Sequence, residues 1–282
     1  MPRPPAPSFS DRNGPDGLCQ PADQAELDAE ELIARWHGRG RASYAVTVRF
    51  APTSTPEQLR IAGRLLERHP GVTLHSHLAE NTIEGAWVGE LFPGARSYLD
   101  VYVRHGLVGP RSLLAHGIWL DDTDRAEIAD RGATLVHCPT SNLFLGSGLM
   151  PWRTCDRQRV PVVLGSDVGA GTTLAMQPVM ADAYRVEALQ GVRLPAWRAL
   201  YAATRGAARA LGLEHELGSL DVGCVADLAV WRWAGGPVAE LRDRAATSLH
   251  ERVFAWLMLA DEHNLLETWV AGRPAYVGPR PD

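Results

Sequence analysis

The spacing of apolar and polar residues changes repeatedly along the chain. Short apolar runs, which are typical of buried parallel strands, alternate with longer stretches whose apolar residues recur every three or four positions, as in helices. The predicted strands cover residues 44–50, 72–77, 112–116, 134–138 and 160–167. The predicted helices cover residues 22–36, 55–69, 83–105 (with a break at 92–94), 121–130 and 175–190, and two short ones lie between 195 and 211. Strands that alternate with helices predict an α/β fold with a parallel sheet.

The pattern changes after residue 211. A Gly-rich turn at 218–223 precedes a β-rich stretch at 226–233, an amphipathic helix at 249–260 and a hairpin at 265–277. We therefore predict three parts: a disordered leader at 1–20, an incomplete (β/α) barrel at 21–212, and the remnant of a small C-terminal β-sandwich at 213–282 that includes the helix. The loop at 139–148 is expected to be irregular because it is rich in Pro, Ser, Asn and Gly.

Composition narrows the classes of partner. The 282 residues are 45% hydrophobic and carry a formal net charge of -5. No Lys/Arg run indicates a nucleic-acid surface, and no apolar run approaches the roughly 20 residues that span a bilayer. The N-terminus lacks the apolar core of a secretory signal. The four cysteines are scattered, which argues against a disulfide framework or a thiolate zinc site and favours the reducing cytoplasm. They are Cys19, Cys138, Cys155 and Cys224.

The stretch 72–81 carries the first candidate chemistry. Side chains alternate along a strand, so His75 and His77 project from the same face near its end. Glu80 follows three residues after His77, where the chain leaves the strand. An imidazole and a carboxylate placed in this way suit a metal ligand and a general acid or base. His75 could add a second ligand, although a polar residue filling the barrel interior is the simpler explanation.

Later strands end in a similar way. Arg49, His116 and Asp167 each stand at the end of a predicted strand. In parallel barrels the carboxyl ends of the strands form the active-site face, so these groups would converge on one mouth together with His77 and Glu80. Histidine and aspartate form a ligand set that suits zinc or iron. Glu80 would then move protons on and off a metal-bound water, whose pKa falls toward about 7.

Each of these residues also has a structural explanation. His116 could hydrogen-bond to a neighbouring loop, Asp167 could cap a turn, and Arg49 could form a surface salt bridge. For single residues we would favour those explanations. Ionisable groups at the ends of four of the five predicted strands are hard to explain by structure alone, so the joint pattern favours a functional site.

Several motifs together resemble a known family. They are Thr-Val-Arg-Phe at 47–50, Ser-His-Leu-Ala-Glu-Asn at 76–81, Ala-His-Gly at 115–117, His-Cys-Pro-Thr-Ser-Asn-Leu at 137–143 and Gly-Ser-Asp-Val at 165–168. The combination resembles the guanine deaminases of the amidohydrolase superfamily. The resemblance runs from about Asp11 to the C-terminus and includes Gly-Ser-Leu-Asp-Val-Gly-Cys-Val-Ala-Asp-Leu at 218–228.

The resemblance implies a TIM (β/α)8 barrel and the zinc-dependent hydrolysis of guanine to xanthine and ammonia. His77 and Asp167 would be zinc ligands, and His116 would lie against the zinc-bound water. Glu80 would carry a proton from that water to the purine, with Asp167 assisting. Arg49 and Phe50 would hold the base, because a guanidinium matches the O6 and N7 acceptors of guanine. The family also suggests a homodimer, and iron is the alternative metal.

The chain also departs from this family. Members begin with a β segment, followed by a first barrel strand that ends in His-x-His, yet no histidine precedes His37 here. Five strands are predicted of the eight that such a barrel uses. We expect a fragment or a misassigned start; an inactive gene product and a rebuilt protein completed by a partner are the alternatives. Alternative functions are an amidohydrolase acting on another purine, a pterin or a triazine, and a non-catalytic fragment.

Overall fold

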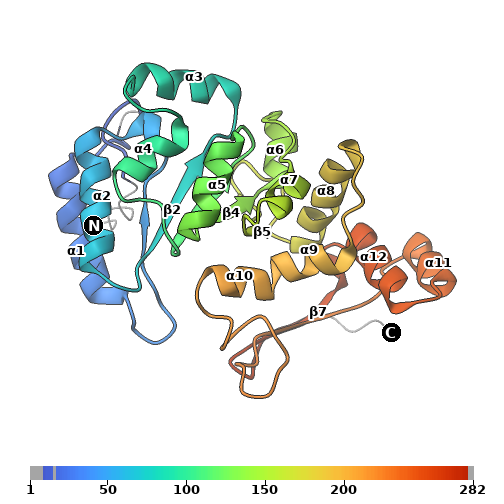
Figure 1. The fold of residues 1–282 in the computed structure, drawn as a ribbon. Helices are drawn as coiled ribbons and strands as arrows, with labels where there is room; N and C mark the ends of the chain where they lie inside the picture. The colour runs from blue at the N-terminus through green and yellow to red at the C-terminus, as the bar shows by residue number, and fades with distance from the viewer. Residues whose placement is uncertain (1–8, 15–16, 279–282) are drawn as a thin grey trace. The chain divides into compact units, whose positions relative to one another are not determined.

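The computed structural model describes residues 9–14 and 17–278, and five of its strands form one sheet in sequence order (Figure 1). They are β1 (Ala45–Thr47), β2 (Thr73–Leu78), β3 (Ser112–His116), β4 (Thr134–His137) and β5 (Val162–Leu164). The pairs from β1 to β4 are all parallel. The predicted α/β class and the five-stranded parallel sheet are confirmed. No helix of the described chain has both the length and the apolar character needed to cross a membrane.

The contacts of the chain divide it into two compact units. Unit 1 comprises Met1–Val136 and Thr154–Pro161, and unit 2 comprises His137–Arg153 and Val162–Asp282. The short helix α7 (Trp152–Arg157) contains residues of both. The domain boundaries predicted at residues 20 and 212 remain a prediction.

Unit 1 forms its core between strands and amphipathic helices. Its helices are α1 (Ala22–Trp36), the 3₁₀ turn η1 (Ala51–Thr53), α2 (Pro56–Arg68), α3 (Thr82–Leu91), α4 (Tyr98–Arg104) and α5 (Asp122–Arg131). Leu74 of β2 and Leu114 of β3 are fully buried, as are Leu59 and Leu65 of α2. Figure 1 shows α1 and α2 side by side, and their residues are in contact. Burial of these apolar faces supplies most of the stabilisation of such a layer.

The segment predicted as a disordered leader is partly described. Residues 1–8 and 15–16 lie outside the described residues. Phe9 is fully buried, and its N–H donates to the carbonyl oxygen of Thr47 at 2.8 Å. The Asp11 carboxylate accepts from the backbone N–H of Thr55 at 2.7 Å, while Thr55 itself caps α2. The described part of this segment is therefore held against β1 and α2, because it satisfies backbone groups that would otherwise be unpaired.

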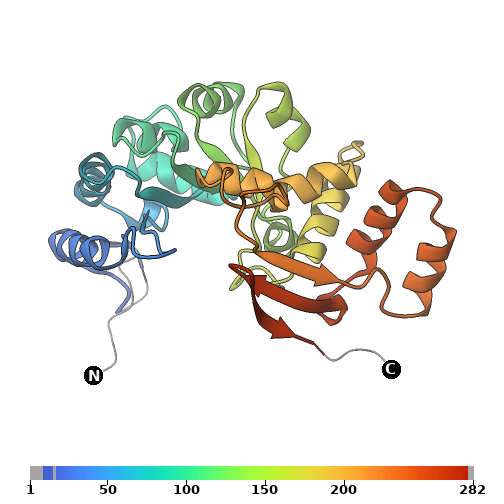
Figure 2. The ribbon, with the colours of Figure 1, turned by 90° about the horizontal axis from the view of Figure 1, so that it is seen from below.

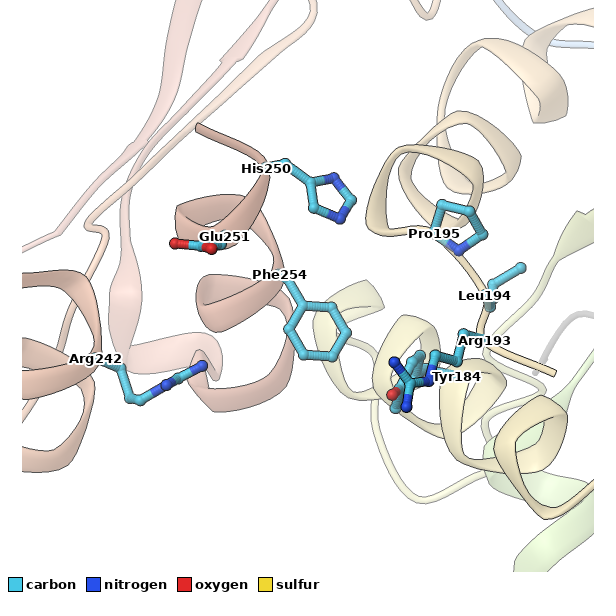
Figure 3. A pocket seen from close by; sticks show the side chains of 8 residues that line it. All are labelled: Tyr184, Arg193, Leu194, Pro195, Arg242, His250, Glu251 and Phe254. Carbon is cyan, nitrogen blue, oxygen red and sulfur yellow. The ribbon is translucent and has the colours of Figure 1, made fainter. Parts of the chain in front are cut away.

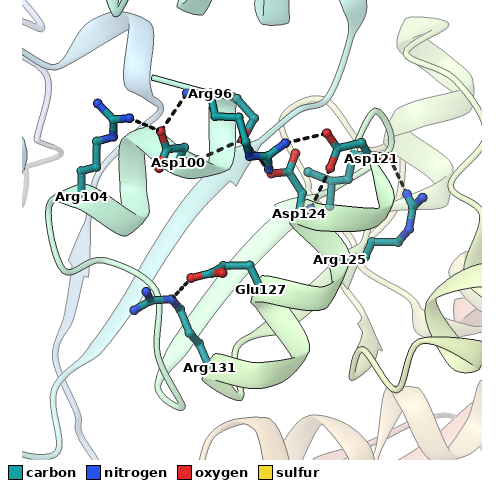
Figure 4. Close-up of polar contacts among 10 residues, drawn as sticks. Arg96, Asp100, Arg104, Asp121, Asp124, Arg125, Glu127 and Arg131 are labelled. Atoms are coloured by element: carbon teal, nitrogen blue, oxygen red, sulfur yellow. Dashed lines mark hydrogen bonds and ion pairs between the residues drawn. The ribbon is translucent and has the colours of Figure 1, made fainter. Parts of the chain in front are cut away.

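A network of ion pairs fixes the starts of α4 and α5 (Figure 4). Arg96 pairs with Asp121 at 2.7 Å and also with Asp124. Asp121 caps α5, and Ser97, which caps α4, donates to Asp124 at 2.6 Å. Burial of Asp124 raises the pKa of its carboxyl group. The network joins the two helix starts within unit 1.

Unit 2 combines helices with a separate antiparallel sheet (Figure 2). Its helices are α6 (Pro139–Leu145), α8 (Met176–Leu189), α9 (Ala196–Ala203), α10 (Arg205–Ala210), α11 (Pro237–Ala245) and α12 (Leu249–Leu259), with the 3₁₀ turn η2 (Glu262–Asn264). Helices α8, α9 and α12 contact one another. The sheet has the order β6 (Leu228–Trp231), β7 (Leu265–Val270), β8 (Arg273–Val277). The predicted hairpin at 265–277 is confirmed as β7 and β8.

Three helices of the described chain, α6, α7 and α11, were not predicted. The loop expected at 139–148 contains α6, which starts with Pro139 at its first turn and ends at Gly146 with φ +69°. Its first four residues are buried, so packing outweighs their turn-forming character. Helix α11 was not predicted; none of its described residues is buried, so it lacks the apolar stripe by which helices are recognised.

Candidate active site

The ends of β2 and β3 bring two histidines together in unit 1. His77 lies one residue before the end of β2, and His116 ends β3. The parallel register pairs His77 with Ala115 and Leu78 with His116. The two imidazole rings stack with centroids 5.4 Å apart and an interplanar angle of 24°. The parallel register brings the two residues to neighbouring strand ends, but it pairs His116 with Leu78, so pairing alone would point the two side chains to opposite faces of the sheet. The turn of the backbone at His116, where φ is +72°, brings the two rings together.

The backbone at these strand ends adopts a conformation that is uncommon for residues other than glycine. The φ angle is +47° at Ala79 and +72° at His116. The carbonyl oxygen of Ala79 accepts from the N–H groups of Ile118 and Trp119, both at 3.1 Å, which ties the two turns together. Such strain costs on the order of 1–3 kcal/mol and clusters at functional sites. The positive φ angles of Ala79 and His116 therefore mark the ends of β2 and β3 as a candidate functional site.

The orientation of His77 is set by a backbone carbonyl. Its Nδ1 lies 2.5 Å from the carbonyl oxygen of Arg49. A carbonyl oxygen can only accept, so Nδ1 carries the proton, and in the neutral imidazole Nε2 keeps its lone pair. Metal-binding histidines usually donate their second nitrogen in this way. The donor chemistry of His77 therefore fits a divalent metal.

Glu80 lies next to His116. Its Oε2 is 3.8 Å from His116 Nε2, and the side chains are 17% and 1% exposed, respectively. A carboxylate and an imidazole at this separation can both reach a small molecule that lies beside them and exchange protons with it. Glu80 is also the more exposed of the two, so a ligand can reach it.

Arg49 and Phe50 form a wall beside the histidines. The Phe50 ring meets the His77 ring edge-on at 6.5 Å, and it meets the ring of Trp87 from α3 at 6.2 Å. The Arg49 guanidinium lies 5.3 Å from the centroid of the Phe50 ring. Arg49 is exposed and Phe50 is half-buried. A cationic donor fork beside an aromatic ring suits a flat heterocycle with acceptor atoms.

Asp167 belongs to unit 2, where it follows β5. Its φ is +50°, and its backbone carbonyl accepts from the N–H groups of Ala170 and Gly171 at 3.1 and 2.5 Å. The backbone rather than the carboxylate closes this turn. Within unit 1, the structure brings together Arg49, Phe50, His77, Glu80 and His116.

Some residues behind the site were missed from the sequence. Tyr102 donates to the carbonyl oxygen of His77 at 2.9 Å, and Glu84 accepts from the N–H of Glu80 at 2.9 Å. The spacing of Asn81 and Glu84 is a capping-box signal that could have revealed Glu84. No pattern in the sequence connects Tyr102 with His77, because they lie on separate elements 25 residues apart.

A cavity of about 300 Å³ lies in unit 2 (Figure 3). The rings of Tyr184 and Phe254 meet edge-on at 4.9 Å in its wall. The other lining residues are Arg193, Leu194, Pro195, Arg242, His250 and Glu251. None of these residues belongs to the motifs found in the sequence.

Comparison with known proteins identifies the family. The model of the amidohydrolase family matches residues 10–274. The chain belongs to the amidohydrolase family. The predicted family is thereby confirmed. Amidohydrolases are typically metal-dependent, and the histidine donors of unit 1 agree with that property.

Individual relatives are more specific. This amidohydrolase is 42% identical over 266 residues to guanine deaminase of Escherichia coli, across 94% of this chain and 61% of the relative. The solved structure of that E. coli enzyme matches with a TM-score of 0.94 over 96% of this chain and 64% of that chain, at 41% identity. A guanine deaminase from C. acetobutylicum with bound guanine matches with a TM-score of 0.86 and 30% identity, over 95% of this chain and 64% of that chain. An 8-oxoguanine deaminase of Pseudomonas aeruginosa is 36% identical, over 80% of this chain and 51% of the relative.

The chain matches only part of the length of these relatives. It spans less than two thirds of the length of each of these relatives. Their names describe whole proteins, and the residues 10–274 that match the family model include every motif found in the sequence.

Proposed function

We propose that this amidohydrolase takes part in the zinc-dependent hydrolysis of guanine to xanthine and ammonia. The main observation in support of this function is the series of contacts in unit 1 from Arg49 through Phe50 and His77 to His116 and Glu80. The guanine deaminase relatives, at 42% and 30% identity, support the choice of substrate.

His77 and Asp167 are the proposed metal ligands. His77 would bind through Nε2, because Arg49 occupies its Nδ1, and Asp167 would bind through its carboxylate. His116 would lie beside the reacting water. Bound zinc would supply Lewis-acid activation of water near neutral pH, and iron could take the same ligands.

The remaining residues would handle the base and its proton. Arg49 would donate to O6 and N7 of guanine, and Phe50 would cover a face of the ring. Glu80 would accept a proton from water and pass it to the purine, with Asp167 assisting. In the balanced reaction, water adds at the carbon that bears the amino group, and that amino group leaves as ammonia.

A related substrate is the second candidate. The 8-oxoguanine deaminase relative favours another purine, and pterins and triazines are further heterocycles with similar acceptor atoms. Arg49→Ala distinguishes these cases. We expect it to raise the KM for guanine by about 10-fold or more through the lost charged hydrogen bonds. An unchanged KM for guanine would rule out our choice of substrate.

The test of the main proposal uses ammonia release and metal content together. The purified chain is incubated with zinc and guanine, alone and with the N-terminal portion of E. coli guanine deaminase that it does not span. We expect stoichiometric zinc, and xanthine and ammonia in equal amounts in at least one of the two samples. Zinc-free protein that is inactive in both samples would support the non-catalytic alternative.

We also propose a cytoplasmic location and a homodimer. Cell fractionation and light scattering of the purified protein test these two points separately. A monomer at micromolar concentration would contradict the homodimer without affecting the proposed reaction.

A further inference from the structure

A buried polar cluster lies beneath the end of β2 in unit 1. Its members are Ser76, Glu84, Tyr98 and Tyr102, which are 1%, 6%, 7% and 0% exposed. They come from β2, α3 and α4. Buried polar groups are costly unless they are bonded, so the partners of this cluster indicate what it does.

The tyrosines act on the backbone of His77. The hydroxyl of Tyr102 donates to the carbonyl oxygen of His77 at 2.9 Å and lies 2.8 Å from the hydroxyl of Ser76. The hydroxyl of Tyr98 lies 3.5 Å from the same carbonyl oxygen and accepts from the backbone N–H of Ala51 at 3.2 Å. Helix α4 therefore fixes the peptide group that follows the His77 side chain.

Glu84 acts on the backbone of Glu80. In a capping box, the third helical residue accepts only from the N–H of the cap residue. Glu84 forms that bond with the N–H of Asn81 at 3.4 Å, and the same oxygen accepts from the N–H of Glu80 at the shorter distance of 2.9 Å. Asn81 completes the box by accepting from the N–H of Glu84 at 2.9 Å. The main bond of Glu84 is thus made to the residue before the cap.

Burying a carboxylate at the start of a helix costs free energy. Burial raises the pKa of Glu84, and the neighbouring charge of Glu80 adds to this effect. In helix α12 the equivalent third residue, Glu251, also accepts from the N–H of the residue before the cap, Thr247, at 2.7 Å, yet Glu251 is exposed. Capping alone therefore does not explain why Glu84 is buried here.

We propose that Glu84 and Tyr102 are positioning residues that hold Glu80 and His77, respectively, on one rigid turn. Ala79 lies between His77 and Glu80 in the sequence. Its left-handed backbone would relax without the hydrogen bonds that Tyr102 and Glu84 make to those two residues. The turn would keep a metal donor and a proton carrier at a fixed separation. The catalytic consequence rests on the proposed deamination, whereas the rigidity of the turn does not.

The first experiment measures the rigidity itself. Amide hydrogen exchange at Glu80 is followed by NMR in the purified chain and in Glu84→Ala, with Glu84→Gln as the conservative variant. Losing a hydrogen bond to a charged group should speed exchange at Glu80 about 10-fold or more. Glu84→Gln keeps an acceptor oxygen and should restore most of the protection. Equal exchange rates at Glu80 in the wild type and Glu84→Ala would overturn the proposal.

A matched control separates positioning from general loosening. Glu187 in unit 2 is also buried, and it accepts from a backbone N–H, that of Trp152, at 3.1 Å. Glu187→Ala should leave exchange at Glu80 unchanged. If Glu187→Ala speeds exchange at Glu80 as much as Glu84→Ala does, the effect is global and the positioning role is wrong.

The second experiment concerns the two functional groups. Tyr102→Phe keeps the ring but loses the bond to His77, and it should weaken zinc binding by about 10-fold, in the range seen for groups that orient ligands. The kinetics use whichever sample releases ammonia, the chain alone or the chain with the N-terminal portion of the E. coli enzyme. There, Glu84→Ala should lower kcat with little change in the KM for guanine, and Glu84→Gln should restore kcat. Unchanged kcat in Glu84→Ala with faster exchange at Glu80 would reject the catalytic consequence. A wild type without deamination would reject the proposed function, and the exchange comparison would still decide the role of Glu84.

Discussion

Histidine and carboxylates come together at two strand ends, after β2 in unit 1 and before β7 in unit 2. After β2, His77 is oriented by the Arg49 carbonyl group and His116 is almost completely buried. Before β7, Asp261, Glu262 and His263 share an exposed turn, where the His263 side chain is 83% exposed. The same residue types are present at both ends. The comparison shows that fixed orientation and burial, rather than composition, distinguish a candidate site from a polar turn.

The two sheets differ in the same sense. In the parallel strand β2, buried residues alternate with more exposed ones, and in β3 all residues but one are buried. By contrast, every residue of β8 is exposed. A strand buried on both faces contributes to the core and fixes its neighbours. Strand β8 can keep its position through backbone pairing with β7 with little burial, so we expect it to tolerate substitution.

The largest expected effect is on zinc affinity. His77→Ala should weaken zinc binding by about 1000-fold, because loss of a ligand exceeds the 10- to 100-fold effect of orienting groups. His263→Ala should leave the affinity unchanged, since its side chain is 83% exposed and lies in a separate turn. Isothermal titration with zinc measures both. Equal losses in the two variants would remove the distinction between the two strand ends.

The next effect is on stability. Leu74→Ala in β2 should lower the free energy of unfolding by about 3 kcal/mol, since it creates a cavity in the buried sheet. Val277→Ala in β8 should change it by less than about 0.5 kcal/mol, because Val277 is 58% exposed. Urea unfolding followed by circular dichroism tests the pair. Similar losses would show that the hairpin is as much a part of the core as β2.

A smaller effect separates two glutamates by pH. Burial raises the pKa of Glu84 above its ordinary value of 4.5, so its contribution to stability is full below about pH 4.5 and is lost as the pH rises through the folded-state pKa. Hydrogen bonds from the Thr247 N–H and hydroxyl lower the pKa of the exposed Glu251, so its contribution is present above about pH 4.5 and is lost as the pH falls through the lowered pKa.

Unfolding curves at several pH values reveal these opposite signs. Raising the pH from 4 to 8 should reduce the stability of the wild type relative to Glu84→Gln. Lowering the pH from 6 to 3 should reduce the stability of the wild type relative to Glu251→Gln. A pH dependence of the same sign in both comparisons would contradict the difference in burial between the two sites.

The smallest effect concerns two alanines with left-handed backbone. Ala79 follows β2 with φ +47°, and Ala271 lies in the β7–β8 turn with φ +50°. Glycine relieves about 1–2 kcal/mol of strain but loses about 0.5–1 kcal/mol through the unfolded state, so Ala271→Gly should stabilise by roughly 0.5 kcal/mol. Ala79→Gly should have a similar effect on stability. Thermal unfolding tests both, and destabilisation at Ala271 would show that its turn is not strained.

Much of the fold could be predicted because periodicity was strong. The helix at 22–36 and the strand at 112–116 match α1 and β3 in their bounds. Helix α6 was missed because its first residues are turn formers, and only their burial in unit 2 makes them helical. Local sequence does not contain that tertiary information.

The placement of His77, Glu80 and His116 was predictable to a similar extent. Motif spacing brought His77, Glu80 and His116 to neighbouring strand ends, because parallel pairing makes sequence order into spatial order. The supporting groups were not predictable. The Arg49 group that orients His77 is a backbone carbonyl, which every residue possesses, and Tyr102 reaches His77 from another element.

The backbone of His116 limits what could replace it during evolution. With φ at +72°, the position admits glycine readily and favours Asn, Asp and His among the other residues, while β-branched side chains are outliers. Among the other side chains that commonly bind metals or transfer protons, Cys, Glu and Lys are disfavoured at this φ angle. They would also change the chemistry of the position. A mutational library at position 116 should therefore be depleted of Val, Ile and Thr even when only folding is selected.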